Sequence, residues 1–105
     1  MSKTIFNKLV RDHIPEMITI IGKEPVCEIL DDEKYIQMLE KKLQEEIDEY
    51  LVAKEPEELA DLLEVIYALS EANGLSPEEL EKIRSDKAEE RGTFSKKILL
   101  VEVQE

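Results

Sequence analysis

Apolar residues recur along most of this chain at the three- and four-residue spacing that is typical of amphipathic helices. The longest such stripe predicts a helix that begins at Asp31 or Asp32 and runs to about Ala53. Pro56 is a residue type favoured in the first turn of a helix, and it predicts a second long helix that closes at Gly74. Because only a short turn separates these helices, we expect them to form an antiparallel hairpin.

Two shorter helices are predicted on either side of this hairpin. Asp12 is a candidate cap for an N-terminal helix that ends at Gly22. Ser76, followed by a proline and two glutamates, predicts a C-terminal helix that ends near Gly92. Together these elements predict an all-α fold, in which the hairpin forms part of a helical bundle and residues 1–105 make a single domain.

Two apolar stretches lack helical spacing. The first covers residues 26–30, and the second, residues 96–103, is rich in isoleucine, leucine and valine. These residue types are enriched in strands. We therefore expect the second stretch to form a short strand near the C-terminus, paired with the first, as the one β element of the fold.

The composition limits the class of partner. The chain has 105 residues, with 26 acidic and 14 basic side chains and a net charge of -12. Such a chain lacks the basic face that binding to nucleic acid or to an anionic membrane surface requires. No apolar run is long enough to span a bilayer. Cys27 is the single cysteine, which excludes an internal disulfide, and no apolar signal core is present, so we expect a cytoplasmic protein.

Four carboxylates stand out in the predicted hairpin, in the segments EEIDE and EELAD. Glu46 and Glu49 lie three residues apart, as do Glu58 and Asp61, so each pair shares one side of its helix. Facing positions in an antiparallel hairpin have a constant sum, and the pairs Glu46–Asp61 and Glu49–Glu58 share one sum. The register therefore predicts that all four carboxylates meet across the hairpin.

Helical phase tests this hypothesis, because an acidic run is usually a solvated helix face. Glu58 falls within the apolar arc of its helix and Asp61 lies at the edge, whereas Glu57 points away. Glu46 lies beside the apolar stripe of the preceding helix, and Glu45 is nearly opposite. Converging carboxylates repel one another unless a hard cation lies among them. The pattern predicts a metal site, with buried salt bridges as the alternative.

The predicted C-terminal helix supplies the opposite charge. Lys87 continues the apolar line of Leu80 and Ile83, and Arg91 follows one turn later. Both side chains are candidates for binding phosphate oxygens. The alternative is that they complement the helix dipole or extend to solvent from the edge of the core.

At this point the chain resembles the all-α nucleoside triphosphate pyrophosphohydrolase superfamily, which includes MazG-type enzymes, dimeric dUTPases and phosphoribosyl-ATP pyrophosphohydrolases. The hallmark of that superfamily is EExxE followed by ExxD on adjacent helices. Here these motifs are Glu45-Glu46-x-x-Glu49 and Glu58-x-x-Asp61. The resemblance implies that Glu46, Glu49, Glu58 and Asp61 bind Mg²⁺, with Mn²⁺ as a substitute.

A narrower likeness extends over nearly the whole chain, to MazG-like, phosphoribosyl-ATP pyrophosphohydrolase-like proteins that are predicted house-cleaning enzymes for aberrant nucleotides. Four ordered blocks carry this likeness: NKLVRDHIPE (7–16), KKLQEEIDEY (41–50), EELADLLEVIYAL (57–69) and KAEERGTFSKKILL (87–100). Two departures stand out. Only eight residues separate Glu49 from Glu58, and His13 stands where a lysine is expected.

The resemblance implies a hydrolase that cleaves the α–β phosphate link of a nucleoside triphosphate and releases a monophosphate and pyrophosphate. Glu46 or Glu49 would deprotonate or orient the attacking water. The candidate substrate-binding residues are Lys87, Arg91, Lys8, Arg11 and Asn7. One alternative is a phosphoribosyl-ATP pyrophosphohydrolase, and another is a non-catalytic, acidic helical interaction module.

Self-association is expected under any of these readings. Amphipathic helices with few aromatic residues provide a thin core for a monomer of 105 residues. Paired helical hairpins are also usual in the superfamily that the chain resembles. We therefore expect a homodimer or a homotetramer.

Overall fold

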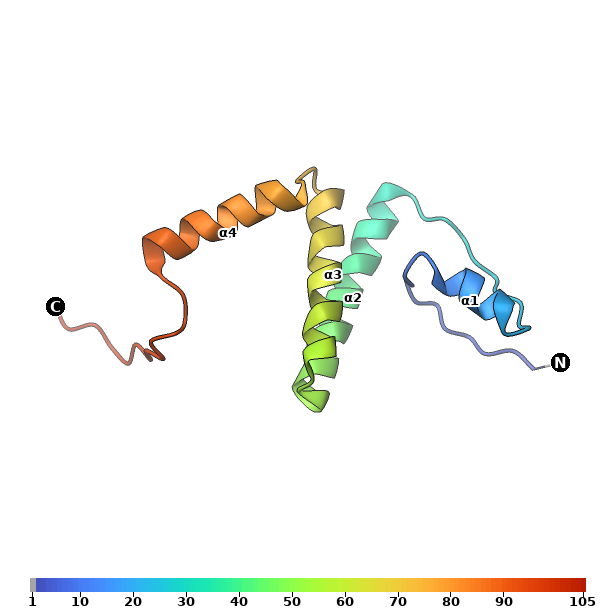
Figure 1. The fold of residues 1–105 in the computed structure, drawn as a ribbon, viewed down its shortest axis with the longest axis horizontal. Coiled ribbons are helices and arrows are strands. Elements are labelled where there is room, and N and C mark those ends of the chain that lie inside the picture. Colours follow the sequence, from blue (N-terminus) through green and yellow to red (C-terminus); the bar gives the residue numbers. More distant parts are fainter. Residues whose placement is uncertain (1) are drawn as a thin grey trace.

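The computed structural model describes residues 2–105, which contain helices and no strand, so the predicted all-α class is confirmed (Figure 1). The central element is an antiparallel hairpin of the two longest helices, which pack against each other along their length. The helices are α1 (Ile14–Ile20), α2 (Asp32–Ala53), α3 (Pro56–Ala72) and α4 (Pro77–Arg91).

Local signals at the ends of α2 and α3 produce the hairpin. The side chain of Asp31 accepts a hydrogen bond of 2.8 Å from the backbone N–H of Lys34 and so caps α2. Lys54 ends α2 in the left-handed conformation, with φ 58°. Glu55 is extended, as a residue before proline tends to be, and Pro56 begins α3. The predicted turn is therefore confirmed.

The two shorter helices differ in how well their starts are specified. Ser76 and Glu79 form a reciprocal capping box that begins α4, because each side chain accepts a hydrogen bond from the other residue's backbone. The predicted cap of α1 is wrong. His13, and not Asp12, is the capping residue, and no side-chain hydrogen bond stabilises this end.

The predicted β pair is also wrong. Neither residues 26–30 nor residues 96–103 form a strand, and Val26 and Ile29 are almost fully exposed. Two short strands without a third strand or a covering helix are marginal in water. Within residues 2–105 nearly every residue of the two stretches is exposed, so strand-forming composition alone does not produce a sheet.

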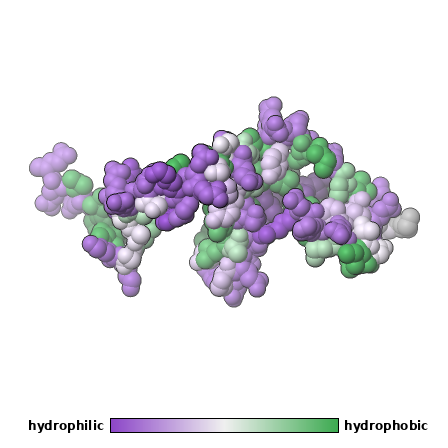
Figure 2. All heavy atoms as spheres, turned by 45° about the horizontal axis from the view of Figure 1, so that its top comes forward, coloured by the Kyte–Doolittle hydropathy of each residue, from purple (hydrophilic) through white to green (hydrophobic). Residues whose placement is uncertain are grey.

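The core is small and lies between α2 and α3. Leu39 from α2 and Val65 from α3 are its buried apolar residues within the described part of the chain. The apolar arc of α3 is wider than one partner helix can cover, and Leu59, Leu63 and Ile66 remain substantially exposed. Figure 2 shows further apolar surface on both sides of the hairpin, toward each chain end.

The chain is extended. Its radius of gyration is 18.6 Å and it measures 68 × 31 × 24 Å, whereas a compact domain of this length has a radius of gyration of about 13 Å. Helix α4 leaves the open end of the hairpin and contacts α3 alone among the helices (Figure 1). Within residues 2–105, no helix combines the length and the apolar character needed to cross a membrane.

Candidate metal centre

The hairpin brings three of the four predicted carboxylates together in its half nearest the turn. One carboxylate oxygen from each of Glu46, Glu58 and Asp61 lies within 4.8 Å of the others. Glu46 comes from α2, and the other two come from α3. The predicted pairing of Glu46 with Asp61 across the hairpin is therefore confirmed.

Glu46 is the most unusual member of this cluster. Only 5% of its surface is exposed, and its Oε2 atom is buried without a hydrogen-bond partner among the described residues. Burial raises the pKa of this carboxyl group above its ordinary value, and the neighbouring Glu49 raises it further. The ammonium group of Lys42 opposes this rise. A buried carboxylate oxygen without a donor is a poor structural element, and it is available to a cation.

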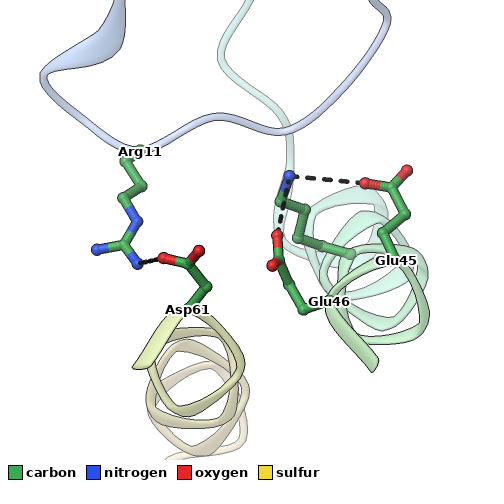
Figure 3. Close-up of polar contacts among 5 residues, drawn as sticks. Arg11, Glu45, Glu46 and Asp61 are labelled. Carbon is green, nitrogen blue, oxygen red and sulfur yellow. Dashed lines mark hydrogen bonds and ion pairs between the residues drawn. The ribbon is translucent and has the colours of Figure 1, made fainter. Parts of the chain in front are cut away.

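Lys42 partly compensates the buried charge. Its Nζ lies 3.4 Å from Oε1 of Glu46 and 3.6 Å from Oε2 of Glu45, one turn along the same helix (Figure 3). Because Lys42 contacts one oxygen of Glu46, the other oxygen remains free. Lys42 is not among the predicted site residues, although its four-residue spacing from Glu46 is a recognised signal for an ion pair. The helical phase of Glu45 predicted a fully solvated side chain. In the structure this side chain is half-buried and lies beside Lys42.

Arg11 reaches the cluster from the N-terminal segment. Its Nη2 donates a hydrogen bond of 2.7 Å to Oδ1 of Asp61, and Figure 3 shows the two side chains directed toward each other. The side chains are 57% and 43% exposed, respectively. An ion pair this exposed is worth roughly 0.2–1 kcal/mol, so a stronger ligand can displace it.

Glu49 does not belong to the group of three. Its side chain is exposed, but it acts on the cluster. It raises the pKa of Glu46 through the close approach of the two carboxyl groups and through its charge, and it raises the pKa of Glu58 through its charge. Partial burial is the larger cause for Glu58, and Asp61 adds to the rise. Glu49 and Glu58 also line a pocket of about 380 Å³ at the turn end of the hairpin. The remaining lining residues are Asp48, Val52 and Ala53.

The other predicted substrate-binding residues lie apart from the carboxylates. Lys87 and Arg91 are exposed on α4, which has no contact with α2. Lys8 and Asn7 are exposed in the N-terminal segment. Within residues 2–105, no ion pair joins Lys87, Arg91 or Lys8 to an acidic side chain, and Asn7 forms no side-chain hydrogen bond.

The donor set suits a hard divalent cation. Carboxylate oxygens are the ligands that Mg²⁺, Mn²⁺ and Ca²⁺ prefer, and no histidine or cysteine ligand is part of the group. No side chain of the described residues donates a hydrogen bond to the buried Oε2 of Glu46, so this oxygen is available as a ligand. A cation here would also reduce the repulsion that raises the pKa of Glu46 and Glu58.

Comparison with known proteins adds one partial likeness. The chain is similar to an uncharacterized protein of Mycolicibacterium smegmatis, with 46% identity over 46 residues. The matched part is 44% of this chain and 47% of that protein, so the likeness spans about half the length of each. No protein-family model and no solved structure matches the chain.

Proposed function

We propose that this protein is a Mg²⁺-dependent nucleoside triphosphate pyrophosphohydrolase, which cleaves the α–β phosphate link of aberrant nucleotides. The observation that carries the proposal is the buried, unpaired Oε2 of Glu46, a residue that forms one cluster with Glu58 and Asp61. A structural salt-bridge network would be expected to pair each buried oxygen. The free oxygen supports a cation as the missing partner.

Glu46, Glu58 and Asp61 would hold the cation, and Glu49, which already raises the pKa of Glu46 and Glu58, would be the fourth carboxylate of the set. When bound, Mg²⁺ supplies positive charge that neutralises phosphate oxygens and lowers the pKa of water. Glu49 is exposed and lines the pocket, which supports its carboxylate as the group that would accept a proton from water. The apolar side chains of Val52 and Ala53 give the same pocket one wall without charge.

The reaction class rests on the resemblance of the acidic motifs to the pyrophosphohydrolase superfamily. The motifs Glu46-x-x-Glu49 and Glu58-x-x-Asp61 lie on adjacent helices of one hairpin, and the proximity of Glu46, Glu58 and Asp61 supports this class. Substrate-binding roles for Lys87 and Arg91 belong to this proposal only if a second copy supplies them, since α4 leaves its own hairpin.

The ion pairs of the cluster favour a second candidate, a non-catalytic helical interaction module. Lys42 and Arg11 already compensate two of the acidic side chains within one chain. In such a module the carboxylates would have a purely structural role. The two candidates differ in their response to cations, because the module predicts no stabilisation by Mg²⁺.

The test is an assay for pyrophosphate release with Mg²⁺ or Mn²⁺, on a panel of standard and damaged nucleoside triphosphates and on phosphoribosyl-ATP. We expect Glu49→Gln and Asp61→Asn to abolish release, because each removes a charged oxygen at the site, while the helical circular dichroism spectrum stays unchanged. Glu64→Gln, an exposed position on α3, is the matched control and should retain activity. Full activity in both site variants would exclude this site assignment.

Self-association in the cytoplasm completes the proposal. The exposed apolar side chains of α3, including Leu59 and Leu63, offer a surface that a second hairpin would cover. We infer a homodimer or homotetramer on this ground. The single cysteine, Cys27, is exposed and unpaired, which is compatible with a reducing compartment.

A further inference from the structure

Arg11 links the N-terminal segment to the carboxylate cluster. Within residues 2–105, its contact with Asp61 is the one hydrogen bond or ion pair that joins residues 2–22 to the hairpin. The backbone of Arg11 is itself held, because its carbonyl oxygen accepts a hydrogen bond of 3.0 Å from the N–H of Ile14 at the start of α1. The main chain of Arg11 is therefore held near the cluster, while its guanidinium group is exposed and able to change partner.

We infer that Arg11 makes the site select a cation that is already bound to a polyphosphate over the bare cation. This inference rests on the proposed metal site. Asp61 belongs both to the ion pair and to the group of three carboxylates, so the guanidinium lies directly beside the cation position. Its positive charge competes with a bare divalent cation for Asp61 and repels it.

A polyphosphate bound to the cation changes the repulsion by Arg11 into an attraction. The complex of a divalent cation with pyrophosphate or a triphosphate is anionic, and guanidinium groups bind phosphate oxygens through paired N–H donors. The ion pair with Asp61 is exposed and weak, so the side chain can move to the phosphate once the cation takes Asp61. Arg11 thus weakens the binding of the bare cation and strengthens the binding of its polyphosphate complex.

The high acidity of the chain makes selection against bare cations useful. A net charge of -12 attracts free divalent cations to the whole surface, and the cluster alone would bind them without substrate. The positive charge of Arg11 beside Asp61 lowers the affinity of the cluster for the bare ion. Binding then depends on the anionic ligand that arrives with it.

Isothermal titration calorimetry of the whole chain tests the inference with Mn²⁺ alone and then with inorganic pyrophosphate at saturating Mn²⁺. One unit charge that contacts a ligand of the cation changes the affinity for that cation roughly tenfold near a protein surface. We expect Arg11→Gln to bind Mn²⁺ about tenfold more tightly and pyrophosphate about tenfold more weakly. Arg11→Lys, which keeps the charge, should restore the tighter binding of pyrophosphate and the weaker binding of Mn²⁺.

Arg84→Gln is the matched control, because Arg84 forms an exposed ion pair with Glu81 on α4 and the same charge is lost. It should change neither affinity. The inference is overturned if Arg11→Gln leaves the Mn²⁺ affinity unchanged or weakens it, or if pyrophosphate binding is not reduced. A wild-type protein that binds no Mn²⁺ would overturn the proposed metal site together with the inference, which separates the two failures.

Discussion

Replacement of Glu46 by glutamine tests whether the buried carboxylate is a ligand or a structural element. Glutamine keeps the shape of the side chain and removes its charge. In the metal-free protein, Oε2 of Glu46 is a buried, unpaired oxygen of a charged carboxylate. An unpaired buried polar group costs about 1–3 kcal/mol and a charged one costs more, so the neutral amide, whose own polar atom also lacks a partner, removes only the extra cost of the charge. Loss of the contact with Lys42 costs about 1 kcal/mol, because Lys42 is 27% exposed and keeps its contact with Glu45. We therefore expect Glu46→Gln to stabilise the metal-free protein by about 1 kcal/mol.

A divalent cation should make wild type more stable than Glu46→Gln. For wild-type protein, a cation at about 100 times its Kd adds about 2.7 kcal/mol to the free energy of unfolding. Glu46→Gln loses a charged ligand and therefore most of this gain. At roughly 4–8 °C per kcal/mol, the variant should melt several degrees above wild type without cation. With cation, it should melt several degrees below.

Thermal melts by far-UV circular dichroism, in chelator and in excess Mg²⁺, measure both differences. Glu45→Gln is the matched control, since Glu45 is the adjacent residue and contacts the same lysine. It should shift the melting temperature little, and equally in both conditions. The reasoning fails if Glu46→Gln destabilises the protein by the same amount with and without Mg²⁺, because Glu46 would then act only through Lys42.

Two other predictions follow from the cluster and from the exposed face of α3. The pKa of Glu46 and of Glu58 is raised, so their contribution to stability is fully present below the ordinary value of 4.5 and is lost as the pH rises through the higher folded-state values. In urea unfolding without cation, the stability advantage of Glu46→Gln over wild type should therefore grow from acid to neutral pH, and a constant difference would contradict this. Sedimentation equilibrium should show wild type as a dimer or larger, and Leu63→Glu as a monomer, because the charge would be buried in the contact between copies. A wild-type monomer at micromolar concentration would contradict the association.

The hairpin was predictable because its signals are local. The start of α2 at Asp31 or Asp32 and the turn before Pro56 each depend on a few neighbouring residues, as does the start of α4 at Ser76, and all three are present in the structure. Register then follows from the length of the turn. The facing of Glu46 and Asp61 could therefore be derived before any tertiary contact was known.

The features that sequence reasoning missed depend on contacts between distant parts of the chain. Helical phase places Lys87 on the inward side of α4, but it cannot say that α4 leaves the hairpin. The role of Arg11 depends on a contact fifty residues away, for which the spacing gives no signal. Residues 96–103 have the composition of a strand but pair with no other strand among residues 2–105.

The position of the carboxylates within the hairpin couples the site to folding. Toward the open end, α2 and α3 meet through Leu39 and Val65, whereas toward the turn they meet through Glu46 and Asp61. An apolar pair at the second position would contribute about 1.5–3 kcal/mol for each side chain buried. This apolar contribution is absent at the second position, where Oε2 of Glu46 is buried and unpaired. A bound cation would replace the missing layer, so that binding free energy becomes folding free energy at the turn end of the hairpin.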